Sequence, residues 1–145
     1  MKEIVIATKN KGKIAEIKLA LKNLPIKVYG LDEFDNVPDA IEDGRSFTEN
    51  AMIKAKFYAD YLNKACLADD SGLEVYNLNG EPGIFSARYA GDNATDADNN
   101  QHLLKRLETL KITDTTCCFR CVLAFVDNET SITTEGICEG VILAE

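Results

Sequence analysis

The chain of 145 residues is long enough for one domain with a buried core and short for several. Its 46% hydrophobic and 28% charged residues are typical of a globular protein, and no apolar run approaches the length of a membrane span. A net charge of −8 argues against a bulk nucleic-acid binder, which normally carries a basic face, and favours a small-molecule partner.

The first half of the chain predicts alternating strands and helices. Short strands are expected at residues 3–7, 26–29 and 66–68. Between the first two strands, Ile14, Ile17, Leu21 and Leu24 recur at helical spacing, and Pro25 ends that helix. An acidic loop is expected at 32–44. A second helix begins at the capping box Ser46-Phe47-Thr48-Glu49, and its apolar stripe consists of Phe47, Ala51, Ala55, Tyr58, Ala59 and Leu62.

The second half predicts a third helix and a hairpin. Residues 73–76 are expected to form a hairpin arm that turns near 77–80, and the glycine-rich segment 81–92 is expected to be a loop. Thr95 caps a helix whose stripe is Leu103, Leu104, Leu107 and Leu110. Strands at 116–126 and 131–143 are joined by Asp127-Asn128-Glu129. The expected architecture is one α/β domain, residues 1–145, with a mixed β-sheet.

A polar cluster follows the first predicted strand and suits phosphate binding. Its members are Thr8, Lys9, Asn10, Lys11, Gly12 and Lys13. The cluster is not a P-loop, because the glycine four residues earlier is absent and Ile14 replaces the Ser/Thr. We nevertheless expect a helix to begin here with its free N–H groups facing a ligand, Thr8 and Asn10 donating hydrogen bonds and Lys13 supplying charge. The same residues are equally compatible with a solvated lysine-rich loop.

A second polar cluster, Asp69-Asp70-Ser71-Gly72, follows the apolar residues 65–68 and is expected at a strand end. Its carboxylates and hydroxyl are the oxygen ligands that Mg²⁺ requires. If the strand geometry persists, the two aspartates point to opposite faces, one toward a cleft and the other toward the scaffold. The alternative is a turn in which the aspartates accept hydrogen bonds from backbone amides.

Two further residues extend the predicted metal and phosphate site. Lys54 lies four residues after Asn50, so both share one face of the second helix. Glu42, shortly before that helix, could bring a second carboxylate to a metal held by an aspartate. Taken alone, Lys54 is better explained as an exposed helix lysine.

The cysteines and the single histidine are expected to have structural roles. The five cysteines are an odd number in mostly apolar runs, and the N-terminus has no signal-peptide core, which favours reduced thiols in the cytoplasm. Cys118 and Cys121 match C-x-x-C, but in a strand they point to opposite faces. His102 lies in a predicted surface helix.

Four motifs taken together carry a family resemblance. They are Thr-x-Asn-x-x-Lys-x-x-Glu (8–16), Phe-Thr-Glu-Asn-Ala-x-x-Lys-Ala (47–55), Ala-Asp-Asp-Ser-Gly-Leu (68–73) and Pro-Gly-Ile-Phe-Ser-Ala-Arg-Tyr-Ala-Gly (82–91). With these motifs in this order, the chain closely resembles the bacterial inosine triphosphate pyrophosphatase family, the Ham1-like dITP/XTP pyrophosphatases. The match extends to Gly140.

The resemblance implies an α/β fold of the ITPase (Ham1/Maf) type, with an elongated mixed sheet flanked by helices and a cleft between two lobes. It implies Mg²⁺-dependent hydrolysis of the non-standard purine nucleotides ITP, dITP and XTP to monophosphate and pyrophosphate, in a cytoplasmic homodimer without nucleic-acid or membrane partners.

The resemblance also implies roles for particular residues. Glu42 and Asp70 would hold the metal, and Asp70 would be the catalytic proton acceptor. Lys54 would reach the phosphates and Ser71 would contact substrate. The remaining substrate-binding residues would be Thr8, Lys9, Asn10, Lys11, Gly12 and Lys13.

The chain departs from the family near its C-terminus. Family members continue with a Gly-Phe-Gly-Tyr-Asp segment and a Ser-His-Arg motif around the base, and neither occurs here. We therefore expect a domain that is incomplete at the C-terminus, and the base preference is left open. One alternative is a catalytically impaired short form or fragment that acts only as a binding or interaction module. A second is a Mg²⁺-dependent phosphatase of another type, suggested by Asp-Asp-Ser alone.

Overall fold

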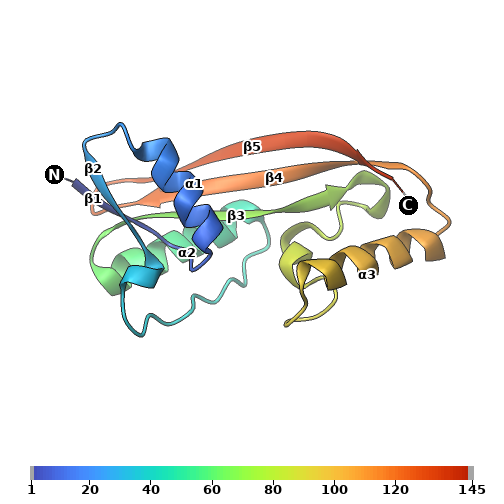
Figure 1. Ribbon diagram of the computed structural model, residues 1–145, viewed down its shortest axis with the longest axis horizontal. Helices are drawn as coiled ribbons and strands as arrows, with labels where there is room; N and C mark the ends of the chain where they lie inside the picture. Colours follow the sequence, from blue (N-terminus) through green and yellow to red (C-terminus); the bar gives the residue numbers. More distant parts are fainter. Residues whose placement is uncertain (1, 144–145) are drawn as a thin grey trace. The chain divides into compact units, whose positions relative to one another are not determined.

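The computed structural model describes residues 2–143 and contains a five-stranded sheet with flanking helices (Figure 1). The strands are β1 (Lys2–Ile6), β2 (Ile26–Gly30), β3 (Ala65–Val75), β4 (Thr115–Val126) and β5 (Ser131–Ile142), in the spatial order β2-β1-β3-β4-β5. The helices are α1 (Lys11–Leu21), α2 (Phe47–Leu62) and α3 (Asp96–Thr109), with 3₁₀ turns η1 (Leu31–Glu33), η2 (Tyr76–Leu78) and η3 (Gly83–Arg88). The predicted mixed α/β sheet is confirmed. No helix within residues 2–143 combines the length and the apolar character needed to cross a membrane.

The chain divides into two compact units. Unit 1 contains the residues up to Asp70 together with Val122–Thr134. Unit 2 contains Ser71–Cys121 and the residues from Glu135 onward. Each unit is described separately below.

In unit 1, β1 is the central parallel strand. It pairs with β2 from Lys2↔Ile26 to Ile6↔Gly30, and with β3 from Ile4↔Ala65 to Ile6↔Leu67. The chain steps from β1 through α1 to β2, and then from β2 through α2 to β3 on the other side of β1. Right-handed crossovers in opposite directions place α1 and α2 on opposite faces of the strands, as Figure 1 shows. The strand order thus reverses between β1 and β3, at the position where open α/β sheets bind ligands.

Helix α2 begins and ends with side-chain and backbone caps. The Ser46 hydroxyl accepts a hydrogen bond from Glu49 N at 3.1 Å, as predicted, but the Glu49 carboxylate accepts from Arg45 N at 2.6 Å, one residue earlier than a regular capping box. Asn63 ends the helix in the left-handed conformation (φ 52°). From the predicted stripe, four side chains are buried: Phe47, Ala51, Ala55 and Tyr58.

The structure extends the short strand predicted at 66–68. β3 runs from Ala65 to Val75 through Asp69-Asp70-Ser71-Gly72, so strand geometry persists through both aspartates and the alternative of a turn is wrong. The strand tolerates two adjacent carboxylates because each meets polar partners on its own face of the sheet.

The first helix also ends earlier than expected, at Leu21, and Leu24 lies in the following turn. The predicted loop 81–92 contains η3, within which the Ser86 hydroxyl donates to Gly83 O at 2.6 Å.

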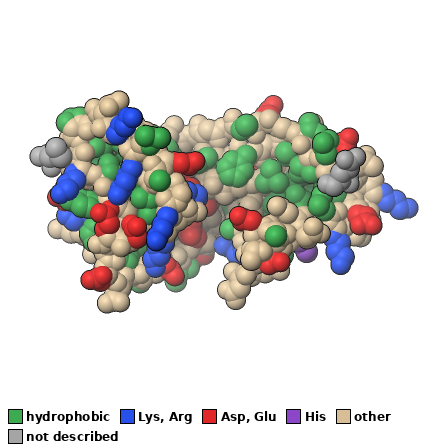
Figure 2. Space-filling view, viewed as in Figure 1, with side chains coloured by type: hydrophobic (Ala, Val, Ile, Leu, Met, Phe, Trp, Pro, Cys, Tyr) green, Lys and Arg blue, Asp and Glu red, His purple; other side chains and the backbone are tan. Residues whose placement is uncertain are grey.

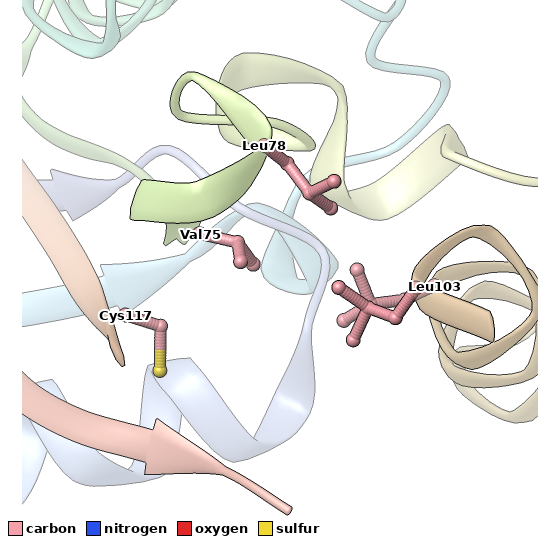
Figure 3. Packing of buried hydrophobic residues seen from close by; sticks show 5 residues of the cluster. Val75, Leu78, Leu103 and Cys117 are labelled. Atoms are coloured by element: carbon pink, nitrogen blue, oxygen red, sulfur yellow. The ribbon is translucent and has the colours of Figure 1, made fainter. Parts of the chain in front are cut away.

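Unit 2 has its own hydrophobic core, which Figure 3 shows. Val75, Leu78, Leu103, Leu107 and Cys117 form this cluster. A capping box between Thr95 and Asp98 begins α3, which confirms the predicted start. Leu103 and Leu107 point into the core as predicted, whereas Leu110 follows the helix and is 48% exposed. His102 lies exposed on α3 with its ring edge-on to Tyr89, in keeping with a structural role.

Strands β4 and β5 form the predicted hairpin. Asp127 shapes its turn by accepting hydrogen bonds from Glu129 N at 2.8 Å and Thr130 N at 2.7 Å. β5 is one of the two edge strands, and its apolar side chains Ile132, Ile137 and Val141 are each more than half exposed. Figure 2 shows hydrophobic side chains along the part of the surface where these strands run.

Candidate functional site

Thr8 and Asn10 build the turn between β1 and α1. Asn10 is the N-cap, and its Oδ1 accepts from Gly12 N at 3.0 Å and Lys13 N at 3.2 Å. The Thr8 hydroxyl accepts from Asn10 N at 3.1 Å. The prediction that the first N–H groups of this helix are free for a ligand is therefore wrong at Gly12 and Lys13. The Thr8 hydroxyl proton and the Asn10 side-chain N–H groups retain their capacity to donate to a ligand.

The lysines of the same cluster have different surroundings. Lys9 Nζ donates to Val37 O at 3.1 Å and to Asp39 Oδ1 at 2.8 Å, so its ammonium lies on the loop that precedes α2. Hydrogen bonding to Asp39 raises the pKa of Lys9. Lys11 and Gly12 are exposed. Substrate binding by these residues stays a prediction.

Asp69 and Lys13 form an ion pair between β3 and α1. Lys13 Nζ lies 2.8 Å from Asp69 Oδ2, and the Asp69 side chain is 7% exposed. The contact identifies Asp69 as the scaffold-facing aspartate, on the face of β3 that meets α1.

Asp70 points to the other face, toward α2. Burial raises its pKa to about 6, and the negative charge of Glu42 adds to that shift. The charge of Lys54 and hydrogen bonding from Asn50 oppose it. Within residues 2–143, Asp70 Oδ2 is a buried oxygen without a hydrogen-bond partner. An ionised carboxylate in this position favours a cation as its missing partner.

Glu42 reaches the same region from the loop before α2. Its Oε1 lies 3.4 Å from Lys54 Nζ, and the Lys54 side chain is only 16% exposed, which excludes the ordinary exposed helix lysine. A cavity of about 360 Å³ opens here within unit 1. Its walls include Thr8, Lys9, Ala40, Glu42, Lys54 and Tyr58. Of the predicted site residues, Thr8, Lys9, Glu42 and Lys54 line this cavity, whereas Asn10, Lys11, Gly12, Lys13 and Asp70 are not part of its walls and Ser71 belongs to unit 2.

The donor set around Asp70 fits Mg²⁺. Within the described residues, no three His, Cys, Asp or Glu side chains come together as a complete metal cage. Mg²⁺ does not need such a cage, because it usually keeps waters and binds one or two carboxylates together with substrate phosphates. Glu42 and Asp70 supply two carboxylates, and the partnerless oxygen of Asp70 is a position for a cation.

Two residues at the site were not assigned a role from the sequence. Asn50 was noted only for sharing a face with Lys54, yet it is 2% exposed and its Oδ1 accepts from Gly44 N at 2.7 Å. Tyr58 was assigned to the apolar stripe, yet its hydroxyl binds the backbone of the loop that carries Glu42. The detectable signal was the spacing of Asn50, Lys54 and Tyr58, each four residues apart.

Comparison with solved structures finds the same fold. A HAM1 protein from Coxiella burnetii matches with a TM-score of 0.91 and 44% identity, covering 100% of this chain and 75% of that one. The Ham1 protein of Staphylococcus aureus matches with a TM-score of 0.86 and 41% identity, covering 99% of this chain and 73% of that one. The likeness therefore extends over the whole chain.

Comparison with curated proteins finds relatives named dITP/XTP pyrophosphatase. The one from Geobacter sulfurreducens is 44% identical over 99% of this chain and 72% of the relative. The one from Syntrophobacter fumaroxidans is 48% identical over 97% of this chain and 60% of the relative, so the chain spans less than two thirds of that protein. The model of the Ham1 family matches residues 4–145. On this evidence, the chain belongs to the Ham1 family.

Proposed function

We propose that the chain hydrolyses non-standard purine nucleoside triphosphates, dITP, XTP and ITP, to the monophosphate and pyrophosphate. Relatives at 44–48% identity are named dITP/XTP pyrophosphatases, and the predicted site residues Thr8, Glu42 and Lys54 line the unit 1 cavity. The single observation that carries the proposal is the partly buried Asp70, opposite Lys54 and Glu42 at the strand-order reversal. The protein would remove these nucleotides from the nucleotide pool as a cytoplasmic homodimer.

Asp70 is the proposed proton acceptor. A pKa of about 6 leaves the carboxylate mostly ionised at neutral pH, yet basic enough to take a proton from an attacking water. Glu42 and Asp70 would hold Mg²⁺, which when bound would neutralise charge on the phosphates. A bound cation would also offset the repulsion between the Glu42 and Asp70 carboxylates.

Lys13 and Lys54 are the proposed phosphate contacts. They extend from two helices on opposite faces of the sheet, and each is paired with a carboxylate, Asp69 or Glu42. A triphosphate would therefore meet ammonium groups already held in place, which lowers the entropy cost of ordering them. Each charge-assisted hydrogen bond to phosphate is expected to contribute about 1–3 kcal/mol.

Product analysis tests the proposal. The 145-residue chain is incubated with dITP, XTP or ITP and Mg²⁺, and pyrophosphate and orthophosphate are measured separately. Pyrophosphate release that is lost in Asp70→Asn, with the fold of the variant verified by circular dichroism, is the expected result. Orthophosphate as the first product would instead support a phosphatase of another type. Nucleotide binding without any product would support the binding-module alternative.

A further inference from the structure

The loop that carries Glu42 lies along α2 in a regular register. Three side chains on one face of α2 contact the 38–44 segment in reverse order. Asn50 accepts from Gly44 N at 2.7 Å, Lys54 pairs with Glu42 at 3.4 Å, and the Tyr58 hydroxyl contacts both Pro38 and Ala40. The segment therefore runs antiparallel to the helix.

The spacing of these contacts follows from the geometry of the two elements. Four residues of α-helix advance about 6 Å, and two residues of extended chain advance about 6.5 Å. Contacts at every fourth helix residue can thus match every second loop residue. The exposure of the segment alternates in the same way, since Asp39, Ile41 and Asp43 face solvent while Ala40, Glu42 and Gly44 are partly covered.

Tyr58 holds the end of the segment farthest from the start of α2. Its hydroxyl donates to Pro38 O at 3.0 Å and accepts from Ala40 N at 3.2 Å, and the side chain is almost fully buried, with 3% of the residue exposed. One buried hydroxyl thus satisfies two backbone groups of a segment without regular secondary structure. Lys9 contacts the same end through Val37 O and Asp39.

We infer that Tyr58 is a positioning residue that sets where Glu42 lies relative to Asp70, by fixing the 38–44 segment in register with Asn50 and Lys54. This inference rests on the proposed function insofar as Glu42 and Asp70 hold a divalent cation. Tyr58 itself touches no reacting group. Loss of the Tyr58 hydroxyl would let the 38–44 segment move, so that the Glu42 carboxylate would spend less time beside Asp70. Cation binding would weaken, while the chemistry at Asp70 would stay unchanged.

The test compares Tyr58→Phe with Tyr61→Phe. Both remove one hydroxyl from α2, but Tyr61 is 53% exposed and lies outside the register described above. Hydrogen–deuterium exchange of peptides covering 37–46 is measured in the metal-free 145-residue chain, and Mn²⁺ binding is measured by electron paramagnetic resonance. For Tyr58→Phe we expect faster exchange in that segment and Mn²⁺ affinity three- to tenfold weaker, from one or two lost hydrogen bonds. Tyr61→Phe is expected to match the wild type in both.

A second variant and an activity measurement keep the outcome decisive. Gly44→Ala disturbs the other end of the segment, because its Cβ would lie 2.7 Å from both Asn50 Oδ1 and Glu49 Cβ, and we expect the same faster exchange. In dITP hydrolysis, Tyr58→Phe should raise the Mg²⁺ concentration for half-maximal rate and leave kcat at saturating Mg²⁺ near the wild-type value. Unchanged exchange and Mn²⁺ affinity in both variants would overturn the inference, even if the wild type is active. If the variants show faster exchange and weaker Mn²⁺ binding while the wild type hydrolyses none of these nucleotides, the inference about Tyr58 is supported and only the proposed function is rejected.

Discussion

Replacing Asp70 with asparagine is expected to stabilise the metal-free protein at neutral pH. Burial and the charge of Glu42 raise the pKa of Asp70 from 3.8 to about 6. A folded-state pKa above the unfolded value means that ionisation favours the unfolded chain, so the stability contributed by this group is full below about pH 4 and is lost as the pH rises to about 6. Asparagine resembles the neutral carboxyl group and avoids that loss.

The size of the effect follows from the same shift in pKa. About two units correspond to roughly 3 kcal/mol at 1.36 kcal/mol per unit. Because Asp70 is only partly enclosed, solvent screening should reduce this to about 1–2 kcal/mol. We therefore expect Asp70→Asn to raise the melting temperature at pH 7.5 by about 3–6 °C. Near pH 4 the difference should largely vanish, because Asp70 is then mostly protonated in the folded wild type.

The assay is thermal unfolding in EDTA at both pH values, followed by circular dichroism. Asp69→Asn is the matched control, one residue away on β3. It leaves the Lys13 ammonium without its carboxylate partner, so it should lower stability at pH 7.5 by about 1–2 kcal/mol. If Asp70→Asn lowered the melting temperature at pH 7.5 as much as Asp69→Asn, the assignment of the two aspartates to different environments would be wrong.

Two further predictions concern a thiol and a helix cap. Burial raises the pKa of Cys66 to about 12, so iodoacetamide at pH 8 should modify the exposed Cys138 and leave Cys66 unmodified in native protein, as mapped by peptide mass; equal labelling would contradict this. Asn10→Ala removes the acceptor for Gly12 N and Lys13 N and should lower the free energy of unfolding in urea by about 1 kcal/mol, whereas an unchanged midpoint would show that the cap is not needed.

The helices were predictable from the sequence because their signals are local. Ser46 and Thr95 each lie directly before a helix that they cap, and the apolar stripes repeat within a few residues. The continuity of β3 was not predictable in the same way. Asp69 pairs with Lys13, which lies 56 positions away in the chain, and only the folded arrangement brings the two together.

The site shows the same division between local and distant signals. The sequence analysis predicted Glu42, Lys54 and Asp70 at one site, and the structure places these three side chains near one another, whereas their binding roles stay predictions. It gave no sign that Lys9 contacts the backbone at Val37, or that Tyr58 does the same at Pro38. Contacts with backbone carbonyl groups leave no trace in residue type, because every residue carries one.

The two adjacent aspartates of β3 interact with two different helices. Because side chains alternate along a strand, Asp69 meets α1 and Asp70 meets α2. A one-residue insertion earlier in β3 would move Asp69 to the face of α2 and leave Ala68 opposite Lys13, whereas a one-residue deletion would place Asp70 opposite Lys13. We therefore expect this strand to tolerate changes of side chain far better than changes of length, and an inserted alanine after Leu67 to be more damaging than most substitutions at that end of the strand.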